Sequence, residues 1–319
     1  MHAGISSSPR HPQPVGHVLL RRLCLIAMLA MSPAPVLASG TADDDANLIP
    51  TSAARGSAFD STYRAIDTDG RYRVTTRFRT FAGETLSLGF ELPAGASRAS
   101  LREFGIADDE LDALLKACMA SSRCEQRDFD RQTTRYYRDH ALRLRRDAGD
   151  RTHLFVDVAQ VVQRNRARVQ PVAAALRRLA AERGHDTQWT IDAAIALVQT
   201  GLVYRKPSQH EDGRQILGFY PPPRALARGY GDCDTKAALL AAILQNLTDA
   251  PIIGVHVPRH YLIGIAGAPR AGQATLHYDG RPFVLVEASG PGRRPPGDIA
   301  DSTQLALDDR RDVRIDPMF

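Results

Sequence analysis

Two segments near the start of the chain alternate between apolar and polar side chains, as strands with one buried face do. In residues 72–78 the side chains suited to burial fall on every second position, and residues 86–92 repeat the pattern. Ala82-Gly83-Glu84 lies between the two segments, which predicts an antiparallel hairpin. A small helix is expected after it, near residues 108–119.

Three later segments place apolar residues every three to four positions, the period of a helix with one buried face. The first covers residues 172–180 and stops at Gly184, and Thr190 is expected to cap the second, which ends at Gly201. Residues 204–223 are rich in proline and glycine and predict a loop. The third helix starts at Asp232 or Cys233 and carries an inner apolar stripe over residues 237–247.

Four strand-like segments follow the third helix, at residues 252–256, 261–265, 274–278 and 283–287. Asp279-Gly280 is a strong hairpin turn between the last two. Helices followed by an antiparallel meander indicate an α+β fold.

The first 38 residues have the form of an export signal. Arg21 and Arg22 precede a short apolar run, and small residues end the segment at Ala38, where we expect cleavage. The apolar run is shorter than the roughly 20 residues of a membrane span, so no span is expected in the mature chain. Residues 39–65 are polar and acidic and predict a disordered lead-in.

The rest of the chain divides into a smaller β-rich region at 66–150 and an α+β domain at 151–319. Whether the smaller region is a separate domain or a decoration of the larger one stays open. The arginine-rich stretch at 125–150 is interpreted as a solvated face, because no aromatic platform accompanies it.

The basic net charge says little about partners. The predicted signal contains three arginines and no acidic residue, so its removal lowers the formal net charge from +5 to +2. Binding of nucleic acid needs a concentrated basic face, and we expect no nucleic-acid partner.

The cysteines suggest one disulfide and one reactive group. Export implies an oxidising compartment, where the close pair Cys118 and Cys124 is expected to form a bridge. Cys233 is then left over, which indicates a reactive thiol or an intermolecular link, unless it is a buried inert residue.

The surroundings of Cys233 favour a reactive thiol. Glycines and Asp232 lead directly into the predicted helix, so Cys233 lies in its first turn, where backbone N–H groups and the helix dipole stabilise a thiolate. Asp232 and Asp234 oppose that effect, so a histidine partner is required.

His260 is the preferred partner, and His256 is the alternative if the strand register differs. His277 is interpreted as a surface residue, and His210 lies in a polar loop that is only a weak candidate for a metal. No spacing of cysteine and histidine suits structural zinc, and no loop has the EF-hand form, so no metal or cofactor is predicted and calcium dependence stays open.

The segment Gly231-Asp232-Cys233-Asp234-Thr235-Lys236, at the start of a helix after a proline-rich approach, resembles the transglutaminase-like superfamily. The resemblance extends upstream over 196–204 and downstream over 258–265 and 283–289, and covers about residues 170–298. It implies a papain-like core with a Cys-His-acid triad. Cys233 matches the nucleophile, His260 the general base and acid, and Glu287 the group that orients the imidazole, where many members have aspartate.

An oxyanion hole would combine the backbone N–H of Cys233 with one further donor. Gln199, Tyr204 and Tyr230 are candidates because of their places beside the motif. Gln199 is otherwise a helix-end residue, Tyr204 a half-buried core residue, and Tyr230 a residue that merely lines the cleft.

The export signal predicts a periplasmic or secreted location. The resemblance implies an enzyme that cleaves or transamidates amide bonds through a thioester, with hydrolysis favoured. Its substrates would be peptides, cell-envelope proteins or cell-wall stem peptides. The alternatives are a non-catalytic binding module with the same fold, and a structural envelope protein whose N-terminal hairpin docks a partner.

Overall fold

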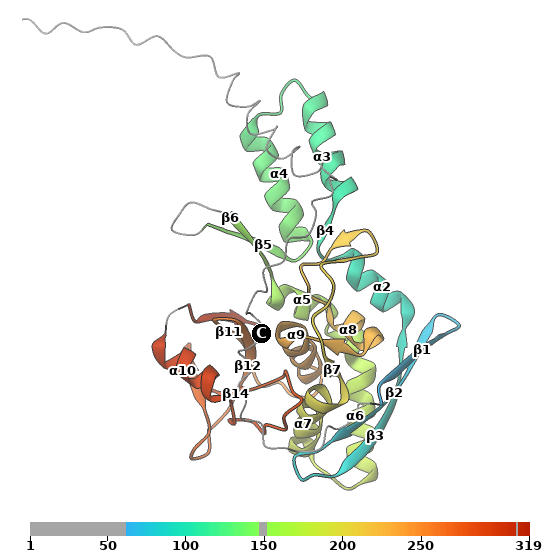
Figure 1. Ribbon diagram of the computed structural model, residues 1–319, viewed down its shortest axis with the longest axis vertical. Helices are drawn as coiled ribbons and strands as arrows, with labels where there is room; N and C mark the ends of the chain where they lie inside the picture. The colour runs from blue at the N-terminus through green and yellow to red at the C-terminus, as the bar shows by residue number, and fades with distance from the viewer. Residues whose placement is uncertain (1–61, 147–151, 311) are drawn as a thin grey trace, which may run out of the picture. The chain divides into compact units, whose positions relative to one another are not determined.

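The computed structural model describes residues 62–146, 152–310 and 312–319, which belong to one compact unit of the chain (Figure 1). The predicted signal peptide lies outside the described residues, as does the predicted lead-in up to residue 61. The last residues of that lead-in, from Arg64, already belong to a strand.

The predicted N-terminal hairpin is confirmed and gains a third strand. The sheet has the order β1-β2-β3 and is antiparallel, with β1 Arg64–Thr68, β2 Arg71–Arg79 and β3 Thr85–Pro93. Its alternating apolar residues, among them Val74, Phe78 and Leu86, are buried in the core that the helices also line. Helix α2, Ala94–Arg102, follows β3.

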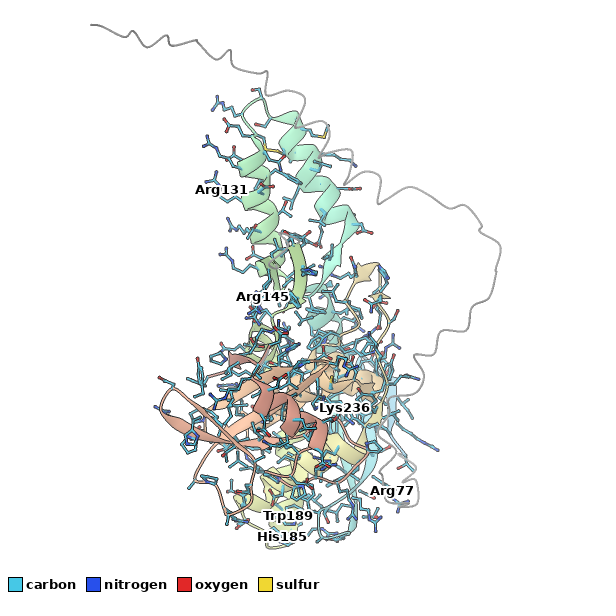
Figure 2. The ribbon with its side chains drawn as sticks, turned by 60° about the vertical axis from the view of Figure 1, so that its left-hand side comes forward. Arg77, Arg131, Arg145, His185, Trp189 and Lys236 are labelled. Atoms are coloured by element: carbon cyan, nitrogen blue, oxygen red, sulfur yellow. A yellow bond between two sulfur atoms is a disulfide. The ribbon has the colours of Figure 1, made fainter. Side chains whose placement is uncertain are left out.

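A pair of polar helices follows. The predicted helix near 108–119 is α3, Asp108–Ala120, and the arginine-rich stretch forms a helix that the sequence pattern did not predict, α4, Gln126–Asp139. α4 buries only Tyr136 and leaves most of its polar residues exposed, and Arg131 points outward (Figure 2). The predicted disulfide between Cys118 and Cys124 joins the facing ends of α3 and α4.

Short strands lie before and after the helices α3 and α4. β4, Ile106–Ala107, precedes α3, while β5, Leu142–Arg146, and β6, Thr152–Val156, form an antiparallel pair after α4.

The central layer is helical and surrounds α9, Cys233–Leu244. Every residue of α9 from Thr235 to Leu244 is buried. Its neighbours are α5 Val158–Asn165, α6 Gln170–Glu182, α7 Thr187–Ala196 and α8 Pro222–Arg228.

Two boundaries in this layer differ from the sequence prediction. α7 starts before Thr190, because Asp186 accepts a hydrogen bond from the backbone N–H of Trp189 and caps the helix. The predicted loop at 204–223 gives way to α8 at Pro222, since proline suits the first position of a helix.

Short elements connect these helices. α7 continues into a π-helical turn, Leu197–Gly201, and the connecting segments contain the strands β7 Val203–Tyr204, β8 His210–Glu211, β9 Arg214–Gln215 and β10 Tyr230–Gly231.

The predicted meander forms most of a five-stranded antiparallel sheet. The order is β13-β14-β12-β11-β15, and α9 packs against β12. The strands are β11 Ile252–Val257, β12 His260–Ala266, β13 Thr275–Tyr278, β14 Arg281–Val286 and β15 Arg314–Pro317.

The edge strand β15 and helix α10, Asp301–Asp309, were not predicted. The α+β class is confirmed, with the cysteine at the start of a helix that packs on an antiparallel sheet. Among the described residues, no helix has the length and apolar character needed to cross a membrane.

Candidate active site

Cys233 is the first residue of α9, and its thiol is free and partly exposed. The approach to the helix depends on two glycines. Gly229 ends α8 with φ +74°, a left-handed conformation that favours glycine. A Cβ on Gly231 would lie 2.3 Å from the side chain of Thr235, so a larger residue there would push α9 away. These two positions therefore fix where the sulfur lies.

His260 and Glu287 come from neighbouring strands of the sheet. His260 is the first residue of β12, Glu287 directly follows β14, and β12 pairs with β14. Nε2 of His260 donates to Oε2 of Glu287 at 2.6 Å, and His260 lines the same pocket as Cys233. Because Nε2 faces the carboxylate, Nδ1 is the ring nitrogen left for the thiol.

Glu287 fits despite the extra methylene that distinguishes it from aspartate. Its Oε1 accepts a hydrogen bond from the hydroxyl of Thr303 at 3.0 Å and one from the backbone N–H of Ala300 at 3.5 Å. Both donors belong to the first turn of α10, where the helix dipole stabilises an anion. The glutamate therefore bridges the imidazole and the start of α10, a helix that the sequence pattern did not reveal.

The protonation of the pair follows from these contacts. Burial by itself lowers the pKa of His260, but the hydrogen bonds and charges of Cys233 and Glu287 raise it to about 10. Burial by itself raises the pKa of Glu287, but the hydrogen bond and charge of His260 hold that pKa below its usual value. Near neutral pH His260 is therefore an imidazolium beside the carboxylate of Glu287.

The two aspartates that flank Cys233 oppose the thiolate less than expected. Burial, followed by the hydrogen bond and charge of Asp232, raises the pKa of Asp234 well above its usual value. A raised pKa reduces the negative charge that Asp234 places beside the sulfur. Asp232 is at the N-cap position, but its side chain makes no capping hydrogen bond. Asp234 instead accepts from the backbone N–H of Thr235 at 2.9 Å.

Only one of the three oxyanion candidates lies at the sulfur. Burial, the charge of Cys233 and a hydrogen bond with it raise the pKa of Tyr204 to about 12, so this half-exposed phenol adjoins the thiol. Gln199 is fully engaged elsewhere: its amide nitrogen donates to the carbonyls of Glu287 at 2.7 Å and Arg294 at 2.8 Å.

The hydroxyl of Tyr230 hydrogen-bonds that of Tyr220 at 2.9 Å, and its ring lies under the guanidinium of Arg205. The oxyanion assignments of Gln199 and Tyr230 are therefore withdrawn, because their polar atoms have other partners.

His256 has a different partner from His260. Its Nε2 accepts a hydrogen bond from Nη2 of Arg314 at 2.8 Å, and burial and the charge of Arg314 lower its pKa. A nitrogen whose lone pair is already engaged by arginine is a poor base, so the structure favours His260 over His256. His210 and His277 lie in no metal site: the described residues contain no group of three potential metal ligands.

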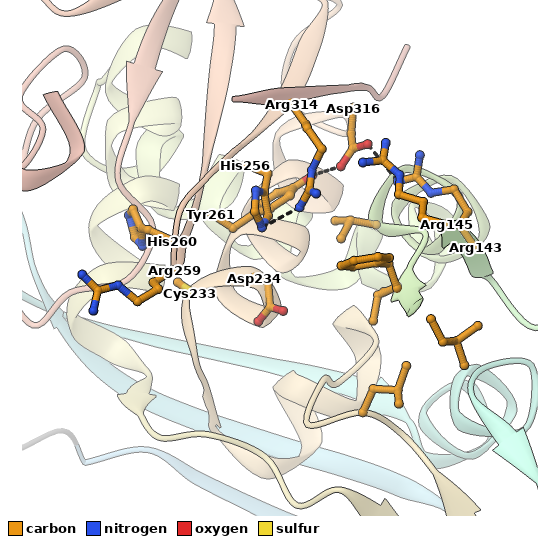
Figure 3. Close-up of a pocket in the computed structure, with 15 residues that line it drawn as sticks. Arg143, Arg145, Cys233, Asp234, His256, Arg259, His260, Tyr261, Arg314 and Asp316 are labelled. Atoms are coloured by element: carbon orange, nitrogen blue, oxygen red, sulfur yellow. Dashed lines mark hydrogen bonds and ion pairs between the residues drawn. The ribbon is translucent and has the colours of Figure 1, made fainter. Parts of the chain in front are cut away.

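The sulfur and the imidazole open into a pocket of about 290 Å³ (Figure 3). Its other walls come from segments for which the sequence predicted no role in the site. They include Arg143 and Arg145 of β5, Phe155 of β6, and Arg314 and Asp316 of β15. The pairing of β15 with β11 brings the last two residues here, and a single sequence contains no signal for such a pairing.

Lys236, one turn after Cys233 on α9, is fully buried (Figure 2). Its ammonium donates to the backbone carbonyls of Ser289 at 2.7 Å, Leu202 at 3.2 Å and Gln199 at 3.3 Å. Burial lowers its pKa to about 7. The sequence motif included this lysine without assigning it a role, and the structure makes it the link between α9 and the segment that follows Glu287.

Comparison of the chain with models of protein families, with curated proteins and with solved structures gave no match.

Proposed function

We propose that this protein is an exported acyl-transfer enzyme of the transglutaminase-like type, with a papain-like core and a Cys233-His260-Glu287 triad. The single observation that carries the proposal is the 2.6 Å hydrogen bond from His260 to Glu287 in the pocket that also contains the free thiol of Cys233. In the proposed triad Cys233 is the nucleophile, His260 the base and Glu287 the acid that orients the imidazole.

The chemistry follows from this order. The imidazolium of His260 stabilises the thiolate, and the sulfur attacks the carbonyl carbon of an amide. His260 gives its proton to the leaving nitrogen, the C–N bond breaks, and a thioester remains on Cys233. In this scheme the backbone N–H of Cys233 and the phenol of Tyr204 donate to the oxyanion.

Water or an amine then takes the acyl group, with His260 as the base. We favour hydrolysis because Cys233 is partly exposed and Tyr204 is 50% exposed, so water reaches the thioester. No cofactor is part of this scheme. The predicted signal and the disulfide support a periplasmic or secreted location, since such bridges persist in oxidising compartments. Peptides, envelope proteins and cell-wall stem peptides remain the proposed substrates.

Alkylation of Cys233 by iodoacetamide tests the proposal. In the wild type the rate constant is expected to be high at neutral pH and to stay level until His260 deprotonates near pH 10. In a His260→Ala variant the thiol should react about 10–100-fold more slowly at pH 7, with a rate that rises through about pH 8.5 as for an ordinary thiol. Mass spectrometry of the alkylated peptide identifies the site. Equal and slow alkylation in both proteins would favour the non-catalytic binding module instead.

Ammonia release separates the two acyl acceptors. With a glutamine-containing peptide, a hydrolase releases ammonia without an added amine and forms the free carboxylate, whereas a transglutaminase incorporates the amine. A peptidase gives a new amino terminus and no ammonia.

Glu287→Gln is expected to lower kcat by about 10²–10⁴-fold while KM changes little. The amide oxygen would accept from Thr303 and Ala300, which turns the amide N–H groups toward His260. The imidazole then carries its proton on Nδ1, facing the sulfur, and cannot act as a base. Steady-state kinetics with a purified peptide substrate measures the change. Glu287→Asp is the control that keeps the charge, and a Gln variant as active as the wild type would contradict the orienting role.

A further inference from the structure

The pocket beside Cys233 has more positive charge than its own acids can balance. Four arginines line it, Arg143, Arg145, Arg259 and Arg314, against Asp234 and Asp316 (Figure 3). We infer that this pocket binds a carboxylate of the substrate, close to the scissile amide, through Arg145 and Arg314. The inference rests on the proposed function and adds to it a substrate class: amides with an acidic group near the bond that is cleaved.

The ion pairs of the pocket show which arginines are available. Arg143 is already engaged, because its Nη2 lies 2.8 Å from Asp316 and its Nε lies 3.4 Å from Asp157. Asp316 in turn also accepts a hydrogen bond from the hydroxyl of Tyr261 at 2.9 Å. Within the described ranges, no carboxylate lies within 4.0 Å of the guanidinium of Arg145 or Arg314.

Arg145 and Arg314, unlike Arg259, both adjoin one aromatic ring. The guanidinium carbon of Arg314 lies 5.3 Å from the ring centroid of Phe155, and that of Arg145 lies 6.0 Å from it. Arg314 also donates to the neutral ring of His256 at 2.8 Å, which leaves its other N–H groups unassigned. Phe155 and the histidine thus hold guanidinium groups without neutralising them.

The electrostatics support this arrangement. Burial and then the charge of Arg145 lower the pKa of Arg314, although Asp316 and Asp312 act in the opposite direction. The raised pKa of Asp234 also reduces the negative charge that this residue offers to the arginines. A bound anion would relieve the repulsion between the two arginines.

A carboxylate on a short aliphatic stem is the ligand that fits these walls. The guanidinium groups offer paired N–H donors that match carboxylate oxygens, and Leu154, Phe155 and Leu217 supply apolar contacts for the stem. The volume of about 290 Å³ is at the lower end for ligand pockets, so the carboxylate must lie within about one or two residues of the scissile amide. It belongs either to an acidic side chain or to the carboxyl end of a peptide.

Chloroacetyl probes test the subsite without a known substrate, because a thiolate displaces their chloride to form a C–S bond. Chloroacetyl-glutamic acid α-amide has a side-chain carboxylate, chloroacetyl-glycine has a terminal one, and chloroacetyl-glutaminamide and chloroacetyl-glycinamide are their neutral counterparts. The second-order rate constants for alkylation of Cys233 are compared in full-length protein. At least one acidic probe is expected to react about 10-fold faster than its neutral counterpart, and the preferred probe identifies the source of the carboxylate.

The ratio of the acidic to the neutral rate constant should fall toward one in Arg145→Ala and Arg314→Met. In Arg145→Glu the neutral probe should react faster than its acidic counterpart. Arg281→Ala is the matched control, because Arg281 is an exposed arginine of β14 that does not line the pocket. Its preference should equal that of the wild type. Unchanged rate constants for the neutral probes show that each variant folds and retains its thiol chemistry.

Two results would overturn the inference in distinguishable ways. Equal rate constants for acidic and neutral probes would remove the carboxylate subsite and leave the triad intact. The same conclusion would follow if the preference for the acidic probe survived in both Arg145→Ala and Arg314→Met. Failure of all probes, neutral ones included, to alkylate Cys233 would remove the proposed enzyme together with the subsite.

Discussion

Cys233→Ala is expected to reduce amide turnover by about 10⁴-fold or more, because the thioester cannot form without the sulfur. Cys233 lies in the first turn of α9 and is partly exposed, so the loss of one sulfur should leave the stability close to that of the wild type. Turnover of a peptide or protein substrate and thermal unfolding are measured on the same preparation. Residual activity above about one hundredth of the wild type would show that another group carries the reaction.

His260→Ala should cause a loss of similar size, and the double variant should be no worse than either single variant. The reason is that a nucleophile and its base act as one unit, so removing the second group after the first has no further effect. Multiplicative losses in the double variant would mean that Cys233 and His260 act independently, which would contradict the proposed triad. His277→Ala is the control, because His277 is an exposed residue of β13 that does not line the pocket.

The pH range in which the triad is stable follows from the two shifted groups. The pKa of His260 is raised to about 10, so its stabilising contribution is complete below about pH 6.5 and is lost as the pH rises through about 10. The pKa of Glu287 is lowered, so its contribution is present above about pH 4.5 and is lost as the pH falls through the folded-state value. The imidazolium–carboxylate pair therefore persists across the neutral range.

Local patterns in the sequence predicted the elements whose signals are local. The alternation in residues 72–78 and 86–92 is a property of the chain itself, and the structure places those residues in β2 and β3. The glycines before Cys233 likewise predicted its place at the start of a helix. The contact between His260 and Glu287 joins residues far apart in the chain, and only the family resemblance suggested it.

Features that depend on tertiary pairing were missed. β15 is a strand because it pairs with β11, and this pairing delivers Arg314 and Asp316 to the pocket. The sequence made Gln199 a candidate for the oxyanion hole, but its amide nitrogen donates to two backbone carbonyls instead. A sequence does not show whether an amide near a motif faces the substrate or the backbone. Thr190 was a plausible cap, but Asp186 precedes it and accepts from the free N–H groups first.

Lys236→Met is expected to lower the free energy of unfolding by about 3 kcal/mol at pH 9. Methionine has a similar volume but offers no N–H group to the carbonyls of Gln199, Leu202 and Ser289, around which the wild-type amine lies. Urea unfolding measures the change, and Lys116→Met, at an exposed position of α3, is the matched control with an expected effect within about 0.5 kcal/mol. An equally stable Lys236→Met variant would mean that the three carbonyls find other partners.

The pH dependence of this deficit gives a second and sharper test of Lys236. Burial lowers the folded-state pKa to about 7, so between about pH 7 and 10.5 the unfolded chain binds a proton that the folded chain does not. Wild-type stability therefore gains about 1.4 kcal/mol per pH unit from this group as the pH rises through that range. Methionine cannot titrate, so the deficit of the variant should grow from pH 7 to pH 9, while the contribution of His260 cancels in the difference.

The same substitution should also lower kcat, because Lys236 positions the catalytic groups although it does not contact the substrate. The ammonium of Lys236 holds the carbonyl of Ser289, two residues beyond Glu287, against the helix that carries Cys233. Without it the carboxylate is less firmly placed beside His260, so kcat is expected to fall by about 10-fold or more while KM changes little. A variant destabilised as predicted, yet with unchanged kcat in its folded fraction, would confine Lys236 to a role in stability. A lowered kcat would make the buried lysine the element that fixes the distance between the nucleophile helix and the strand end that carries the orienting acid.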